Sequence, residues 1–155
     1  MIPHVTTHDE ADSTELEAFR VQMNKELEKS GVKVSMLPFM MKAAVATLKK
    51  FPEFNASLDG DALVLKKYWH IGFAADTPNG LMVPVIRDCD KKSIPEITKE
   101  MGELAKLARD GKTSSWRLTL PLSLSWDHRV IDGAAAARFN VHFANLLADM
   151  RRIMF

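Results

Sequence analysis

One segment of the chain alternates so regularly between apolar and polar side chains that it fixes a strand in the fold. Residues 117–126 place large apolar side chains on one face, namely Leu118, Leu120, Leu122, Leu124 and Trp126. The other face carries Thr119, Ser123 and Ser125, together with Pro121. Because successive side chains of a strand point to opposite sides, this pattern predicts a half-buried strand. The fold must therefore contain a sheet with one covered face.

Helical periodicity predicts four helices, three before this strand and one after it. Apolar residues recur at helical spacing near residues 14–30, 39–50, 94–108 and 133–150. The helix at 39–50, opened by Pro38, is apolar almost all round, so we expect it to be buried. Ser93-Ile94-Pro95-Glu96 has the pattern of a capping box, which predicts the start of the third helix.

Shorter strands are predicted near the N-terminus and in the middle of the chain. Residues 2–7 are β-branched, and apolar residues alternate from Trp69 to Ala75. Thr77-Pro78-Asn79-Gly80 is a turn signal before a returning strand at 81–86, in which Pro84 indicates an edge or a bulge. Strands and helices do not alternate regularly, which predicts an α+β fold with a mixed or antiparallel sheet and helices on one face.

Composition limits the class of protein. A chain of 155 residues fits a single domain, 1–155, and 46% hydrophobic residues suffice for a core. A net charge of +1 argues against a dedicated nucleic-acid binder. The single cysteine, Cys89, excludes an internal disulfide. We find no signal peptide and no apolar run long enough for a membrane span, and we expect a cytoplasmic protein.

The five histidines differ in their surroundings. His4 and His8 are four positions apart, but no third ligand is near them, so we predict no metal site. We expect His70 and His142 to be exposed to solvent. His128 stands apart because it follows the predicted strand and precedes a run of small residues, a rigid and accessible position.

Asp132 follows His128 by four positions, and a carboxylate near an imidazole can fix its tautomer or stabilise its cation. By spacing alone this pair favours a structural role. The longer string Ser123-Leu124-Ser125-Trp126-Asp127-His128-Arg129-Val130-Ile131-Asp132-Gly133-Ala134, however, resembles the active-site signature of the dihydrolipoyl acyltransferase catalytic domains. Residues 2–6, 54–58, 71–81 and 108–112 resemble other parts of that family, so the resemblance covers nearly the whole chain.

The resemblance is strongest to bacterial acetyltransferase cores of the pyruvate dehydrogenase complex, and it implies a chloramphenicol acetyltransferase-like fold. The family moves an acyl group between a dihydrolipoyl thiol and coenzyme A and binds no covalent cofactor. It implies that His128 is the general base and that Asp132 gives polar support. It also implies a homotrimer with active sites between subunits, in many bacteria joined into a cubic cage of 24 subunits, with Ile153, Met154 and Phe155 at contacts between trimers.

The match breaks after Lys112. There the family continues through a long segment that carries the serine thought to stabilise the oxyanion, whereas in this chain only residues 113–116 join the two matching parts. We therefore expect a truncated core, spliced near 113–116 and engineered rather than natural, whose catalysis is impaired or absent. Two alternatives stay open: an active coenzyme A-dependent acetyltransferase with His128 as base, and a monomeric α+β domain without a ligand.

Overall fold

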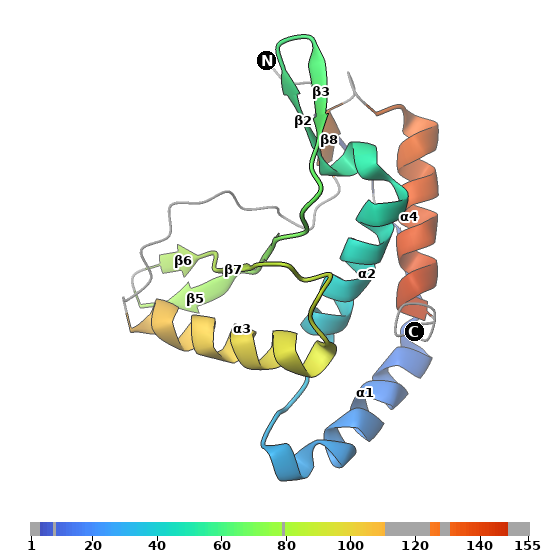
Figure 1. Ribbon diagram of the computed structural model, residues 1–155. Coiled ribbons are helices and arrows are strands. Elements are labelled where there is room, and N and C mark those ends of the chain that lie inside the picture. The colour runs from blue at the N-terminus through green and yellow to red at the C-terminus, as the bar shows by residue number, and fades with distance from the viewer. Residues whose placement is uncertain (1–3, 8, 79, 111–124, 128–130, 149–155) are drawn as a thin grey trace.

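A computed structural model describes residues 4–7, 9–78, 80–110, 125–127 and 131–148. Four longer helices dominate it: α1 (Thr14–Glu26), α2 (Met36–Lys50), α3 (Ile94–Arg109) and α4 (Gly133–Ala148). Short 3-10 turns follow α1 and α2, at Glu28–Ser30 and Pro52–Asn55. Figure 1 shows α2 alongside α4, with α3 at the lower end of α2 and α1 below α4.

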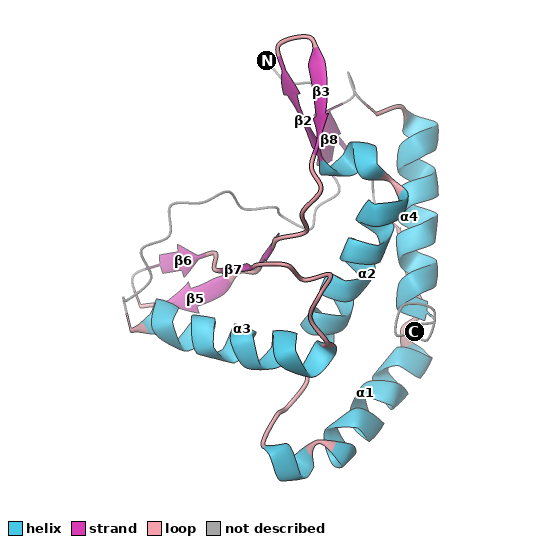
Figure 2. Ribbon diagram, in the orientation of Figure 1, coloured by secondary structure: helices cyan, strands magenta, loops and turns pink. Residues whose placement is uncertain are grey.

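The strands pair into four antiparallel, two-stranded ladders (Figure 2). The pairs are β1 (His4–Thr6) with β8 (Ser125–Asp127), β2 (Ala56–Asp59) with β3 (Ala62–Leu65), β4 (Ile71–Gly72) with β7 (Val85–Ile86), and β5 (Ala75–Thr77) with β6 (Gly80–Met82). The α+β class is thus confirmed. Within the described residues the strands form these separate ladders rather than the single sheet that the sequence led us to expect.

Helix α2 is the centre of the molecule, as its apolar sequence predicts. Eight of its side chains are buried: Pro38, Phe39, Met41, Ala43, Ala44, Val45, Thr47 and Leu48. The helix begins at Met36, earlier than predicted, and Pro38 lies inside its first turn. Proline is tolerated there because the N–H groups of a first turn have no partner within the helix. The predicted start was therefore too late by less than one turn.

Helices α1 and α3 follow their sequence signals closely. Gly31 ends the α1 segment in the left-handed conformation, with φ +68°, where glycine carries no steric cost. The capping box of α3 is present, and the Glu96 Oε2 accepts hydrogen bonds from the Ser93 N–H and Oγ, both at 2.7 Å. These bonds hold the pKa of Glu96 below its usual value.

The predicted returning strand at 81–86 is interrupted. Strand β6 ends at Met82 and β7 starts at Val85, so the break falls at Pro84. Proline has no N–H to donate to a ladder, but the Pro84 carbonyl accepts from the Phe73 N–H at 3.0 Å. This agrees with the bulge or edge that Pro84 indicated.

The hydrophobic core lies on both sides of α2. One cluster joins α2 to α3, α4 and the middle strands, and includes Met41, Ile71 and Ile97. A second cluster joins α2 to α1 and α4, and includes Leu16, Phe39 and Leu146. No helix in the described part of the chain is long and apolar enough to cross a membrane.

Candidate functional site

The strand that leads to His128 is held by the N-terminal strand. Strand β8 pairs antiparallel with β1, with His4 opposite Asp127 and Val5 opposite Trp126. His128 follows Asp127 directly in the sequence and lies outside the described residues. The same is true of residues 153–155 and of most of the predicted strand at 117–126. The structure therefore describes the segments that flank His128 in the sequence, which are β8 and the start of α4. Together with β1, these segments are called the frame below.

Asp132, four positions after His128 in the sequence, caps the start of α4. Its Oδ1 accepts a hydrogen bond from the Ala135 N–H at 2.7 Å, and its backbone carbonyl accepts from the Ala136 N–H at 3.1 Å. This is the arrangement of a helix N-cap, in which a side-chain oxygen satisfies a first-turn N–H that has no helical partner. One oxygen of Asp132 is thus engaged in starting α4.

Strand β1 also braces α4. The Asn140 Nδ2 of α4 donates to Thr7 Oγ1, just after β1, at 2.8 Å. Val5 packs against a small buried cluster of Ile131, Ala135 and Ala136. The ends that flank residues 128–130, β8 and the start of α4, are therefore both tied to β1.

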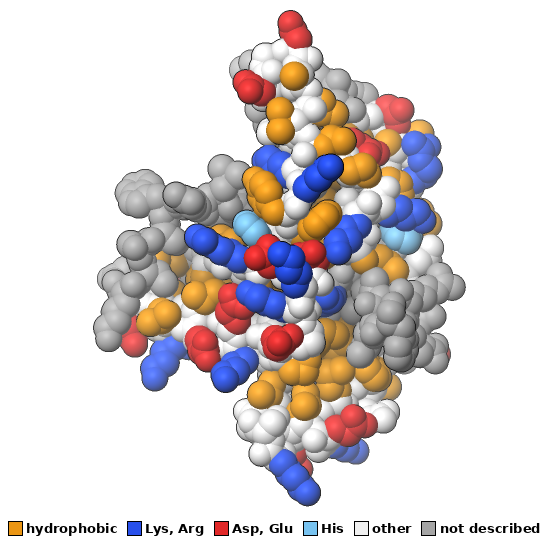
Figure 3. Space-filling view, viewed as in Figure 1, with side chains coloured by type: hydrophobic (Ala, Val, Ile, Leu, Met, Phe, Trp, Pro, Cys, Tyr) orange, Lys and Arg blue, Asp and Glu red, His pale blue; other side chains and the backbone are white. Residues whose placement is uncertain are grey.

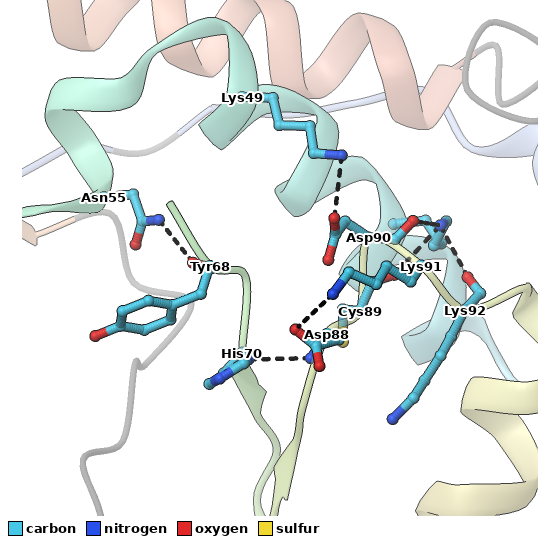
Figure 4. A network of polar contacts seen from close by, with 10 residues as sticks. Lys49, Asn55, Tyr68, His70, Asp88, Cys89, Asp90, Lys91 and Lys92 are labelled. Carbon is cyan, nitrogen blue, oxygen red and sulfur yellow. Dashed lines mark hydrogen bonds and ion pairs between the residues drawn. The ribbon is translucent and has the colours of Figure 1, made fainter. Parts of the chain in front are cut away.

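The structure corrects the expectation for His70. Its imidazole is half-buried, its Nδ1 accepts a hydrogen bond from the Asp88 N–H at 3.0 Å, and its ring lies 4.9 Å from that of Tyr68 (Figure 4). Asp88 adopts φ +50°, a left-handed conformation that is unusual outside glycine. His70 therefore helps to hold a strained turn. The sequence did not predict this role because Asp88, the partner of His70, lies in a different segment of the chain.

His142 was also expected to be solvated, and it too is half-buried. Its ring packs edge-on against Phe51, with centroids 5.8 Å apart. Its Nδ1 lies 3.3 Å from Lys50 Nζ, at the end of α2. The contact joins α4 to α2, so the side chain is part of the helix packing.

A half-buried lysine of α2, Lys42, which sequence reasoning did not single out, binds the 88–92 turn. The Lys42 Nζ donates to three backbone carbonyls, those of Cys89 and Asp90 at 3.3 Å and of Lys92 at 2.9 Å. Burial lowers the pKa of Lys42 from its usual value. The sequence signal for this role was a lysine in the middle of an apolar helix, because a cation at such a position needs hydrogen-bond partners.

Neighbouring groups complete this network. Lys49 lies 3.5 Å from the Asp90 carboxylate (Figure 4). The Lys49 Nζ also lies 4.7 Å from the centre of the Trp69 ring. The Cys89 side chain is fully buried, and burial raises the pKa of its thiol to about 11. A buried, protonated thiol is a poor nucleophile, so the arrangement favours a structural role for Cys89.

Among the described residues no group of three or more histidine, cysteine or acidic side chains could hold a metal ion. His8 lies outside those residues, so the expectation about the His4–His8 pair stays a prediction.

Comparison with protein families decides which family this frame belongs to. The family described as 2-oxoacid dehydrogenases acyltransferase (catalytic domain) matches residues 1–119 and, separately, residues 113–155. The chain belongs to this family. The chain is 59% identical, over 204 residues, to the dihydrolipoyllysine-residue acetyltransferase component of the pyruvate dehydrogenase complex of Cupriavidus necator, and 43% identical to that of Azotobacter vinelandii. It is covered to 99% in both, but spans only 37% and 32% of the relatives' lengths.

Solved structures agree with this assignment. The chain matches a structure of Azotobacter vinelandii dihydrolipoamide acetyltransferase with a TM-score of 0.89 and 40% identity. That structure addressed the role of a serine, a histidine and an asparagine in the catalytic mechanism. A structure of the cubic core of the pyruvate dehydrogenase multienzyme complex matches with a TM-score of 0.88 and 38% identity. In both cases 99% of this chain and 85% of the solved chain are covered.

Proposed function

We propose that this chain is a shortened core subunit of a bacterial dihydrolipoyl acetyltransferase. In this proposal it assembles with copies of itself, as a homotrimer and from trimers into a cubic cage, in the cytoplasm. Its acetyl transfer between dihydrolipoamide and coenzyme A is impaired or absent. The observation that carries the proposal is the family match in two overlapping parts.

The lengths support an internal deletion. The alignment with the Cupriavidus necator protein runs over 204 residues, whereas this chain has 155. The difference consists of positions that the relative has and this chain lacks. The two family matches meet at residues 113–119. We infer that the missing segment belongs there, between α3 and β8.

The chemistry of the retained part supports His128 as a general base. A thiol with a pKa of about 8.5 is mostly protonated at neutral pH, and an imidazole with a pKa of about 6.5 can accept its proton during attack. In the Azotobacter enzyme, the histidine and asparagine studied for the mechanism are spaced as His128 and Asp132 are in this chain. Asp132 starts α4 through its side chain, and asparagine is an equally good N-cap.

The expected loss of activity comes from the oxyanion. Attack of a thiolate on a thioester places negative charge on the carbonyl oxygen, and the family's serine is absent with the deleted segment. Removing one oxyanion donor typically lowers kcat about 10²–10³-fold. The strands that enclose the substrates would be missing too, so the loss in this chain should be at least that large.

Two measurements test the proposal. Size exclusion with light scattering gives the mass of the particle in solution, and a monomer would overturn the assembly. Transfer of acetyl groups from acetyl-coenzyme A to dihydrolipoamide is then compared with the full catalytic domain from Cupriavidus necator. We expect a rate lower by at least about 10²-fold. A rate equal to that of the relative, and lost in His128→Ala, would overturn the impairment and leave an active enzyme.

A further inference from the structure

The hairpin formed by β2 and β3 projects from the body of the molecule (Figure 1). Its base is anchored, because the Asn55 Nδ2 donates to the carbonyls of Lys66 and Tyr68, both at 3.0 Å. Beyond that base, residues 57–59 and 62–65 are exposed on either side of the turn at Gly60, and Ala56 is half-buried. A two-stranded hairpin is only marginally stable alone in water, and packing on another surface stabilises it.

The register of the hairpin divides its side chains into two faces. Ala56 pairs with Leu65 and Leu58 with Leu63, so these four apolar residues share one face. Ser57 pairs with Val64 and Asp59 with Ala62 on the other face, which is mixed. The leucines at 58, 63 and 65 are 43%, 43% and 48% exposed. The core of its own subunit therefore leaves these three leucines uncovered.

Charges bracket this apolar face with opposite signs at its two ends. Asp61 stands in the turn at the tip, and Lys67 follows the end of β3 near the base, and both residues are exposed. Neither makes an ion pair within the described residues. Figure 3 shows the same order along this projection, with acidic side chains at its tip, hydrophobic ones below and basic ones next. A pattern of this kind is complementary to itself when one copy is reversed.

We propose that the apolar face of the β2–β3 hairpin packs against the same face of a second copy of this chain, related by a two-fold axis. Reversing one hairpin places the acidic tip of each copy over the basic base of the other and buries the leucines between them. A two-fold contact uses the same surface on both subunits, which is what a self-complementary patch provides. The proposal rests on the assembly proposed above, and it names one of the surfaces that make it.

The first test changes one face at a time. Leu63→Glu places a charge in the apolar face, and Val64→Glu is its matched control, because Val64 is 45% exposed but belongs to the other face. The masses of both are compared with the unchanged chain by light scattering. We expect Leu63→Glu to have a smaller particle mass and Val64→Glu to keep the native mass. Equal masses for all three would overturn the hairpin contact while leaving the assembly intact.

A second test asks whether the contact is two-fold. Asp61→Lys and Lys67→Glu each bring like charges together in the reversed arrangement, so each alone should weaken the association several-fold, most clearly at low salt. The double variant exchanges the two charges and should restore the native dissociation constant. Additive weakening in the double variant would overturn the pairing of tip with base. If the unchanged chain is already a monomer, the assembly itself and this contact both fail.

Discussion

At the residue scale, the side chains that matter most are those whose partners come from distant segments. Asp132 caps the start of α4 and lies only four positions after His128 in the sequence. His70 and Lys42 hold one turn from opposite sides, through the Asp88 N–H and three carbonyls of residues 89–92. The local sequence can show that such a residue is unusual for its position. Its hydrogen-bond partners, however, come from other segments and depend on the fold.

Replacing Asp132 separates its cap from its charge. Asp132→Ala removes the acceptor for the Ala135 N–H and should lower the free energy of unfolding by about 1 kcal/mol, within the range for lost N-caps. Asp132→Asn keeps the acceptor and should leave the stability within about 0.5 kcal/mol of the native value. Urea denaturation followed by circular dichroism measures both. An equal loss in the two variants would show that the charge, not the cap, stabilises this end of α4.

The buried thiol of Cys89 makes stability depend on pH in the alkaline range. Its pKa is raised from 9.0 to about 11 in the folded chain, so between these values the folded state keeps a proton that the unfolded state has lost. Stability from this group is therefore complete below pH 9 and falls as the pH rises towards about 11. We expect Cys89→Ala to fall less steeply with pH over this window in urea denaturation. Parallel curves for the two proteins would contradict the burial of a protonated thiol.

At the element scale, the helices were predicted well and the ladders poorly. Helices α1, α2 and α3 carry their own signals, such as the Ser93–Glu96 capping box and Gly31, and these act over one or two turns. The pairing of strands depends on residues that are not neighbours in the sequence. The Phe73 N–H, for example, donates a hydrogen bond to the Pro84 carbonyl. Of the residues that alternate from Trp69 to Ala75, Ile71, Phe73 and Ala75 are buried. The alternation did not predict that the segment is broken, with Ile71 in β4, Ala75 in β5 and Phe73 between the two strands.

Packing of α4 on the rest of the chain depends on Phe139. This ring is 6% exposed and stacks on Phe54, with centroids 4.2 Å apart. Phe139→Ala should lower the free energy of unfolding by about 3–5 kcal/mol, because a large buried ring leaves a cavity. Val141→Ala, at a side chain that is 54% exposed on the same helix, should change it by less than about 0.5 kcal/mol. Chemical denaturation provides the comparison, with Phe139→Leu in reserve should the alanine variant not fold. Similar small losses for Phe139→Ala and Val141→Ala would contradict a core role for this helix face.

At the scale of the whole molecule, the family and the fold class followed from the sequence, whereas the arrangement of the sheet did not. The string around His128 is long enough to identify the family, and the family match covers the chain in two parts. Of the strand predicted at 117–126, only Ser125 and Trp126 lie within the described residues, where they are part of β8, and the rest stays a prediction. Alternation identifies a strand and its buried face, but the neighbour of a strand is settled by topology. The roles of His128 and of residues 153–155 stay predictions.

The pairing of β1 with β8 sets an order of events in time. Val5 is made long before its partner Trp126, because the two lie near opposite ends of the chain. Chains are synthesised from the N-terminus at about 5–20 residues per second, so β1 exists for several seconds with an unpaired edge. Helices α1, α2 and α3 can pack during that interval, because many of their contacts lie within the part already made. The frame beside His128 therefore closes last, when the later part of the chain returns to its beginning.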